Sequence, residues 1–189
     1  MIENTFDLDY DYFELLILNQ NSSDGTKFFL DSLNNSRIRI FHSKSNLGVA
    51  GGRNYLASKS NADYLIFLDD DSWFIESKAL NNLKKNILEY NADICGFKII
   101  GDDNKLRDWC YPLSPKNFNQ KVHSSPYYVG CGHAIRNKMF KNLGGYNKNL
   151  FFWGEEIDFV LNCLCSLDLN IKYFPDITVL HVPSKQERF

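Results

Sequence analysis

Three adjacent carboxylates, Asp69-Asp70-Asp71, are the residues whose type and spacing point most directly to chemistry. They follow the apolar segment Tyr64–Leu68, whose pattern predicts a buried strand, and ligands of α/β sheets bind beyond the carboxyl ends of strands. Neighbouring carboxylates repel one another unless a cation or solvent screens them, and a hard divalent cation can also bridge to a substrate diphosphate. The alternatives are a solvated acidic turn or a helix cap, and a cap would explain one aspartate but not three. We therefore predict metal or nucleotide binding here.

A second acidic group, Glu155, Glu156 and Asp158, opens a helix predicted over residues 155–167. The helix dipole favours acidic residues in a first turn, so this pattern alone is a weak signal. With Ile157 taken as the centre of the apolar face, Glu156 and Asp158 lie on its two borders and Glu155 points away. Partial burial at a border can raise the pKa of a carboxyl group toward that of a general base.

Two further features could belong to the same site. His181 follows an apolar segment near the C-terminus; a lone histidine is usually structural, but a neutral imidazole could be a third ligand beside two carboxylates. The glycine-rich segment 48–54 fits neither a dinucleotide-binding nor a P-loop motif, which disfavours a dehydrogenase or an NTPase. Its Arg53 could meet a diphosphate or an acidic side chain.

Composition narrows the class of protein. A chain of 189 residues fits one domain, and a formal net charge of -2 argues against a broad nucleic-acid surface. The five cysteines form no Cys-x-x-Cys pair, so we expect reduced thiols in a cytosolic protein. The start lacks a signal-peptide pattern and no apolar run could span a bilayer. Any membrane association would therefore be peripheral or would need sequence not present here.

The elements that must position these residues alternate along the chain. Strands are predicted at 13–18, 37–41, 64–68, 93–99, 127–129 and 171–182, the fifth breaking at residues 130–132 and the last interrupted at Pro175. Helices are predicted at 27–33, 52–59, 77–90 and 155–167. Residues 101–126 read as an extended excursion. This order predicts a layered α/β domain with helices on both faces of the sheet.

Taken in order, these pieces resemble the inverting family 2 glycosyltransferases of the GT-A fold. The matching segments are 19–26, 46–54, 67–71, 130–132, 144–146 with 151–158, and His181. The resemblance implies a nucleoside-diphosphate sugar donor (UDP- or dTDP-linked), a glycan or lipid-linked acceptor, and a role in polysaccharide biosynthesis. It also implies a place in the cytoplasm or at the inner face of the membrane.

The resemblance also assigns roles to residues. Asp69 and Asp71 look like the metal-binding Asp-x-Asp motif, with His181 as a late ligand to Mn²⁺ or Mg²⁺. Glu156 falls where the family places its catalytic base, with Glu155 and Asp158 in support. The residues expected at the nucleotide sugar are Asn19, Asn46, Gly48, Arg53, Asp69, Asp70, Gly130, Cys131 and Gly132.

Two departures from the family pattern stand out. Members usually begin with a strand, a turn and a helix before the strand at 13–18, whereas residues 1–12 are too short for these, and a base-binding Asp reads Asn19. The chain also ends at Phe189, where the family often continues. We therefore expect a partial single domain, 1–189, with open strand edges, exposed apolar surface, weak donor binding and a tendency to self-associate.

Two other classes of function stay open. One is a catalytically impaired relative that binds a nucleotide sugar, a glycan or a partner transferase, which Asn19 and the missing first unit favour. The other is a metal-dependent nucleotidyltransferase, which would need a basic, glycine-rich N-terminal loop that the sequence does not show.

Overall fold

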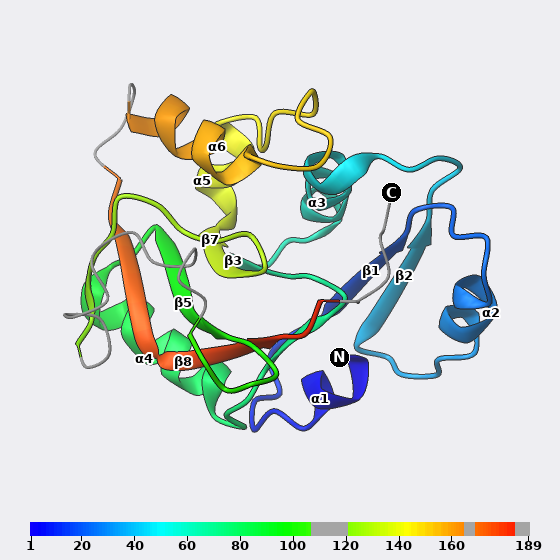
Figure 1. Cartoon of the computed structure of the whole chain (residues 1–189), viewed down its shortest axis with the longest axis horizontal. Helices are drawn as coiled ribbons and strands as arrows, with labels where there is room; N and C mark the ends of the chain where they lie inside the picture. Colours follow the sequence, from blue (N-terminus) through cyan, green and yellow to red (C-terminus); the bar gives the residue numbers. More distant parts are fainter. Residues whose placement is uncertain (107–120, 165–168, 184–189) are drawn as a thin grey trace.

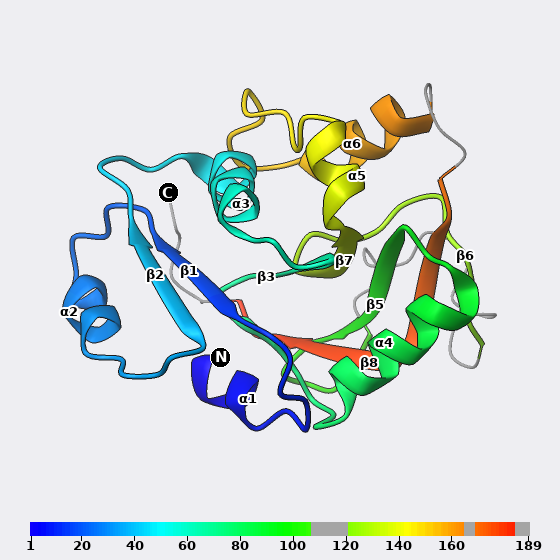
Figure 2. The ribbon, with the colours of Figure 1, turned by 180° about the vertical axis from the view of Figure 1, so that it is seen from behind.

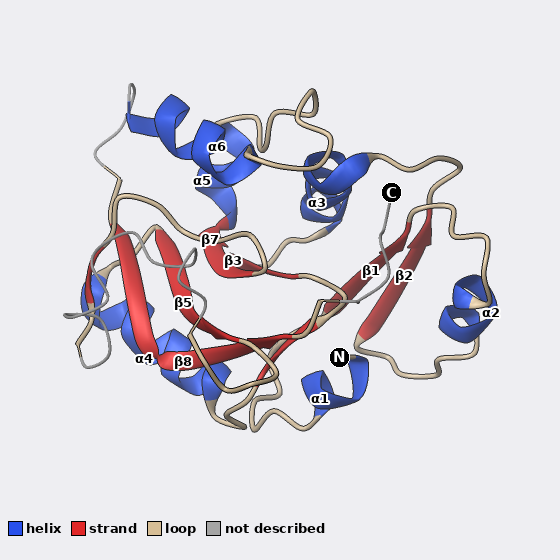
Figure 3. Cartoon of the chain, in the orientation of Figure 1, coloured by secondary structure: helices blue, strands red, loops and turns tan. Residues whose placement is uncertain are grey.

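The computed structural model describes residues 1–106, 121–164 and 169–183. Figure 1 shows a mixed α/β arrangement around a central sheet, and Figure 3 shows where helices and strands alternate. The elements are α1 (Ile2–Phe6), β1 (Leu15–Asn19), α2 (Thr26–Asp31), β2 (Ile38–His42), α3 (Gly48–Lys59), β3 (Tyr64–Leu68), β4 (Ser72–Phe74), α4 (Ala79–Tyr90), β5 (Ile94–Ile100), β6 (His123–Ser124), β7 (Gly132–Arg136), α5 (Asn137–Asn142), α6 (Glu155–Leu164) and β8 (Ile171–His181).

The central sheet has the strand order β3-β7-β5-β8-β4, and β6 pairs with β8. Only the β5–β8 pair within it is parallel; the others are antiparallel. Strand β8 continues through Pro175 rather than breaking there. The expected irregularity is a shift in register opposite Phe97 and Lys98.

Helices cover both faces of this sheet, as the sequence predicts (Figures 1 and 2). On one face α4 buries Leu80 and Leu83 against a core that includes Phe97 and Phe174. On the other face α3, α5 and α6 bury a second core. Strand β3 alternates between the two cores: Leu65 and Phe67 belong to the second, while Tyr64, Ile66 and Leu68 pack against the first.

The strand predicted at 127–129 is wrong. These residues form no strand, and pairing begins at Gly132, where β7 joins β3 and β5. Tyr128 is buried among side chains of the second core instead. Its β-forming residues predicted a strand because side-chain burial and strand pairing favour the same residue types.

Strands β1 and β2 form a separate two-stranded parallel sheet. A cavity of about 600 Å³ lies between β1 and β3, lined by both strands and by apolar residues of α3 and α4 such as Leu56, Leu83 and Ile87. In the described residues β1 pairs only with β2, and β3 only with β7. The open strand edges and apolar surface expected from the sequence are therefore present.

This separation predicts uneven local stability. An isolated pair of strands is marginally stable, whereas β5 is paired on both sides and buried between two helical layers. We expect the amide protons of β1 to exchange with solvent faster than those of β5, as measured by hydrogen–deuterium exchange with mass spectrometry. Equal protection of β1 and β5 would contradict this expectation.

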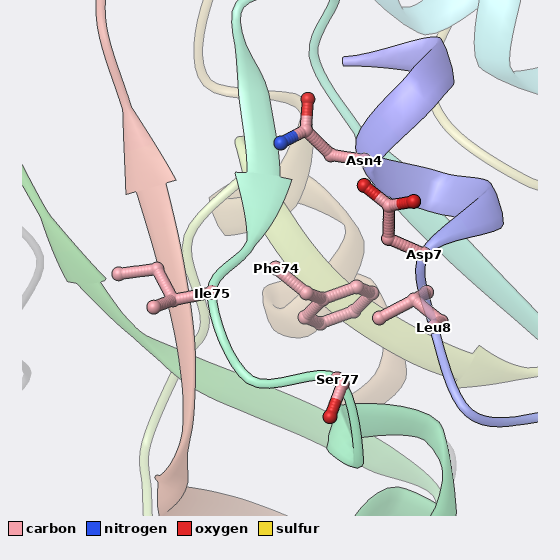
Figure 4. Close-up of a pocket in the computed structure, with 6 residues that line it drawn as sticks. All are labelled: Asn4, Asp7, Leu8, Phe74, Ile75 and Ser77. Carbon is pink, nitrogen blue, oxygen red and sulfur yellow. The ribbon is translucent and has the colours of Figure 1, made fainter.

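A smaller cavity of about 120 Å³ lies between α1 and β4 (Figure 4). Its lining residues are Asn4, Asp7, Leu8, Phe74, Ile75 and Ser77, and Leu8 packs into the first core with Phe74. The segment that follows the short helix α1 therefore contributes Leu8 to that core. None of the helices in the described part of the chain combines the length and hydropathy needed to cross a membrane.

Candidate active site

The acidic turn and the C-terminal histidine meet because β4 pairs with β8. The register of that pair places Ser72 opposite His181, and the Val182 amide donates to the Asp71 carbonyl at 3.0 Å. His181 Nε2 consequently lies 3.3 Å from Asp71 Oδ1. Ligand atoms of Asp69, Asp71 and His181 all lie within 4.8 Å of one another. The structure therefore brings His181 to Asp69 and Asp71, although more than a hundred positions separate it from them in the sequence.

The chemistry of this group fits a divalent cation. Two carboxylates and one imidazole suit Mn²⁺ well and Mg²⁺ through the carboxylates. Two carboxylates held this close to each other repel, and a cation between them would relieve that repulsion. Asp70 is exposed and is not part of the group, so the turn uses alternate aspartates.

Arg53 connects this turn to the second acidic group. Its Nη2 donates to Asp69 Oδ1 at 2.8 Å, and its Nη1 donates to Glu155 at 2.8 Å and to Glu156 at 3.4 Å. Burial disfavours the charged guanidinium, but the carboxylates, Asp69 foremost, outweigh it and raise the pKa of Arg53. Of the two partners that the sequence allows for Arg53, a diphosphate or an acidic side chain, the structure shows the second.

The predicted apolar face of α6 is wrong. Ile157 is 47% exposed, and the buried side of the helix carries Glu155, Phe159, Val160 and Cys163. Glu155, predicted to point away, is only 3% exposed and lies against Arg53. The ion pair with Arg53 offsets the cost of burying the Glu155 carboxylate. Arg53 lies on another helix, so the periodicity of α6 alone cannot reveal this partner.

Glu156 is the more accessible of the two glutamates. Its side chain retains 15% exposure, compared with 4% for Glu155, and its longer contact to Arg53 leaves it less engaged. Asp158 turns along the helix, where its carboxylate accepts a hydrogen bond from Asn162 at 3.0 Å. Geometry therefore favours Glu156 as the carboxylate that a substrate can reach.

The loop Gly130-Cys131-Gly132 closes one wall of this site. The Gly130 carbonyl accepts from Arg53 Nη2 at 2.9 Å, and the Cys131 carbonyl accepts from Ser72 Oγ at 2.8 Å. A Cβ atom at Gly130 would lie 1.7 Å from Glu156 Oε1, so a side chain at this position would displace that carboxylate. The backbone of the loop therefore lies directly against Glu156.

Gly48 performs a similar function at the start of α3. Its φ of +71° lies in the left-handed region, and a Cβ atom there would lie 2.3 Å from the Phe151 carbonyl oxygen. That carbonyl accepts from the Val49 amide at 2.8 Å. The close contact holds the segment that leads into Glu155, so Gly48 acts on the site through the backbone.

Asn19 and Asn46 stabilise turns at the ends of their elements. Asn19 Oδ1 accepts from the Ser22 amide at 3.0 Å, and Asn46 Oδ1 accepts from the Gly48 amide at 2.9 Å. The described contacts of these two residues do not include the Asp69–His181 group. Their predicted roles at a nucleotide stay predictions.

Cys131 is buried, as are Cys95 and Cys163, and all three are free thiols. Burial raises the pKa of Cys95 and of Cys131 to about 12, so neither thiol is a nucleophile near neutral pH. Cys110 and Cys165 lie outside the described residues.

Several residues of the site were missed by sequence reasoning. Ser72 joins the acidic turn to the glycine loop, and Asn54 binds both backbone groups of Tyr146, at 2.7 and 2.8 Å. His133 and Tyr146 lie buried behind the loop. Two features of the sequence could have indicated these residues: the polar Asn54 directly after Arg53, and His133 within the segment that Gly130 and Gly132 interrupt.

The protonation of Glu155 gives a testable pH dependence. Burial, and then the charge of Glu156, raises the pKa of Glu155 from 4.5 to about 7, and its Oε2 atom is buried without a hydrogen-bond partner among the described residues. A carboxyl group with a raised pKa stabilises the folded state below pH 4.5, and this stabilisation is lost as the pH rises through 7.

We therefore expect the free energy of unfolding to fall between pH 5 and pH 8 by about 1–3 kcal/mol through this group. Glu155→Gln should remove that part of the pH dependence, and urea denaturation of both proteins at several pH values measures it. A variant whose stability falls with pH as steeply as that of the parent would contradict the assignment to Glu155.

The family model and the relatives that match this chain are consistent with one family of proteins. Residues 1–144 match the family model described as "Glycosyl transferase family 2". An uncharacterised protein of Haemophilus influenzae is 34% identical over 142 residues, which are 69% of this chain and 75% of that protein. The Escherichia coli protein WfgD, a UDP-Glc:alpha-D-GlcNAc-diphosphoundecaprenol beta-1,3-glucosyltransferase, is 32% identical over 126 residues, which are 65% of this chain and 46% of WfgD.

Solved structures agree in fold. S. aureus TarS 1–349 in complex with UDP-GlcNAc has a TM-score of 0.77 at 14% identity, covering 99% of this chain and 55% of that one. The mannosyltransferase PcManGT from Pyrobaculum calidifontis in complex with GDP-Man and Mn²⁺ has a TM-score of 0.71 at 14% identity, covering 98% and 52%. The chain thus has a GT-A fold and spans about half the length of WfgD and of these solved neighbours.

Proposed function

We propose, from the premise that this chain belongs to glycosyl transferase family 2, that its site transfers a sugar from a nucleoside-diphosphate donor to an acceptor hydroxyl with inversion. The observation that carries this proposal is the convergence of two acidic groups at the carboxyl end of β3. Asp69, Asp71 and His181 form one group, and Arg53 joins Asp69 to Glu155 and Glu156.

Glu156 is proposed as the general base. An acceptor hydroxyl is a poor nucleophile until a carboxylate takes its proton, and Glu156 is the accessible carboxylate beside the glycine loop. Attack from the face opposite the leaving group needs one base rather than a pair of carboxylates. Glu155 and Arg53 hold the helix start and the acidic turn at a fixed separation.

Asp69, Asp71 and His181 are proposed to hold a divalent cation, Mn²⁺ or Mg²⁺. When bound, the cation supplies Lewis-acid stabilisation of the charge that develops on the leaving diphosphate. In the described part of the chain, the side chains gathered at this turn are acidic apart from His181 and Arg53, and the Arg53 guanidinium is already engaged with carboxylates. This charge balance supports a requirement for the cation.

The relatives support a proposal for the donor and the acceptor. TarS is solved with UDP-GlcNAc, PcManGT with GDP-Man and Mn²⁺, and WfgD is named for a UDP-Glc donor and a diphosphoundecaprenol-linked acceptor. We propose a UDP- or dTDP-sugar donor and a glycan or lipid-linked acceptor in polysaccharide biosynthesis. A lipid-linked acceptor would place the protein in the cytoplasm, peripherally at the inner face of the membrane.

A second candidate is a catalytically impaired relative that binds a nucleotide sugar, a glycan or a partner transferase. The separation of the β1–β2 sheet from β3 by an apolar cavity favours it, since a wall of the nucleotide pocket would then depend on a sheet that is not joined to the core. The same separation underlies our expectation of weak donor binding and self-association by the 189-residue chain.

Release of UDP from UDP-sugars, with Mn²⁺ present and at donor concentrations up to saturation, distinguishes the two candidates. A transferase site should release UDP slowly to water even without an acceptor, and chelation of the metal should stop the release. Binding of UDP without any release at saturation would favour the impaired relative and contradict the proposed transfer reaction.

A further inference from the structure

Behind the glycine loop lies a buried chain of polar side chains that the proposed reaction does not use. His133 is fully buried on β7, and its Nδ1 lies 3.0 Å from the Val129 carbonyl and 3.1 Å from the Gly130 carbonyl. Its Nε2 lies 2.7 Å from the Tyr146 hydroxyl, which lies 3.1 Å from the Tyr128 hydroxyl. These contacts lead directly to the loop that touches Glu156.

The donor and acceptor properties of these groups fix the direction of every hydrogen bond in this network. Carbonyl oxygens only accept, so Nδ1 of His133 carries a proton. Burial, and then the nearby charge of Arg53, lowers the pKa of His133, so the ring is neutral and Nε2 accepts. Tyr146 therefore donates to His133, and Tyr128 donates to Tyr146. No member of the network is left unsatisfied.

Tyr146 is itself fixed from the helix that carries Arg53. Asn54 Nδ2 donates to the Tyr146 carbonyl at 2.7 Å, and the Tyr146 amide donates to Asn54 Oδ1 at 2.8 Å. The Tyr146 ring packs against Phe67, Phe140 and Phe159. Two neighbouring residues of α3 thus reach the Gly130 carbonyl, Arg53 directly and Asn54 through Tyr146 and His133.

We propose that His133, with its proton on Nδ1, and Tyr146 are positioning residues that hold the Gly130 carbonyl and thereby set the place of Glu156. Gly130 links the two, because its backbone lies so close to Glu156 that a Cβ atom there would lie 1.7 Å from Glu156 Oε1. A loop released from His133 would move against Glu156 or away from it. The inference rests on the proposed function only in giving Glu156 a role in turnover.

The hydrogen-bond pattern is tested first without any activity. In ¹⁵N-labelled protein without ligand at pH 7, the His133 ring should be neutral, with a protonated Nδ1 and an unprotonated Nε2. In Tyr146→Phe, which keeps the ring packing, the amides of Cys131 and Gly132 should exchange with solvent faster than in the parent. A protonated Nε2, or loop amides that exchange unchanged, would overturn the proposal even if the protein proves inactive.

Paired substitutions at His133 then test the effect on turnover. Asparagine can place its amide nitrogen where Nδ1 was, whereas glutamine reaches the position of Nε2. The net contribution of one such hydrogen bond corresponds to a factor of about 2 to 12. We therefore expect kcat to fall by that factor in His133→Gln and by less in His133→Asn, with KM for the donor little changed. Equal losses in the two variants would overturn the positioning role.

Tyr64→Phe is the matched control for stability. Tyr64 donates a hydroxyl hydrogen bond to the Ala92 carbonyl on the far side of β3, so its loss removes a comparable partly buried bond away from the loop. It should lower the Tm as Tyr146→Phe does but leave kcat unchanged. If kcat follows Tm in both variants alike, the network is only structural and the proposal fails.

Discussion

Replacement of Glu156 by glutamine is expected to lower turnover by about 10²–10⁴-fold while leaving donor binding nearly intact, as for loss of a general base. Glutamine keeps the shape of the side chain and its contact with the Gly130 loop but cannot take a proton from the acceptor. Steady-state kinetics of UDP release measures turnover, and calorimetric titration with UDP and Mn²⁺ measures binding, each against the parent chain.

The neighbouring acidic residues supply the controls. Asp158→Asn should have a small effect, because that carboxylate is directed along α6 toward Asn162. Glu155→Gln should change stability and its pH dependence more than turnover, because Glu155 is buried against Arg53. Unchanged turnover in Glu156→Gln, with a large loss in either neighbour, would move the role of base to that neighbour.

Replacement of Arg53 by methionine is expected to be the most destabilising single change at this site. Methionine retains much of the side-chain volume but leaves Asp69, Glu155 and Glu156 without the guanidinium that all three contact. Breaking a buried ion pair by removing one partner costs about 3–5 kcal/mol, and the acidic turn and the α6 terminus should then separate. Urea denaturation measures the free energy of unfolding.

Arg39→Met is the matched control for this change. Arg39 also makes an ion pair at 2.8 Å, to Glu14, but its side chain is 45% exposed. Exposed pairs contribute about 0–1 kcal/mol, so this variant should lose little. Arg53→Lys should lie between the two, because lysine keeps the charge but cannot contact three carboxylates with a planar fork. If Arg53→Met costs no more than Arg39→Met, Arg53 is not the centre of the site.

Local patterns in the sequence were sufficient to predict a helix or strand whose own residues decide its structure. The apolar run at Tyr64–Leu68 gave β3 with its observed bounds, because a buried strand ending in aspartates has few alternatives. The predicted helix at 52–59 starts too late, since α3 begins at Gly48, whose positive φ depends on the distant Phe151 carbonyl. Helix starts that depend on such a contact cannot be found by propensity.

Long-range compensation accounts for the larger errors. Glu155 is buried and Ile157 exposed because Arg53, on another helix, neutralises the glutamate, which reverses the expected face of α6. His133 looked unremarkable for a different reason: its partners, the Val129 and Gly130 carbonyls and the Tyr146 hydroxyl, are near in sequence but meet it through an irregular loop, which no helix or strand period predicts. His181, by contrast, could be assigned through the family resemblance, and the β4–β8 register then places it beside Asp71.

Binding of Mn²⁺ to the 189-residue chain, followed by electron paramagnetic resonance, tests the central claim most directly, because it needs neither acceptor nor turnover. We expect one bound ion whose affinity rises when UDP is added and falls by at least about tenfold in Asp71→Asn and in His181→Ala. Asp70→Asn, a change of the same charge at the exposed middle of the turn, should bind nearly as the parent does. Equal Mn²⁺ affinity in the parent, Asp71→Asn and His181→Ala would contradict the account.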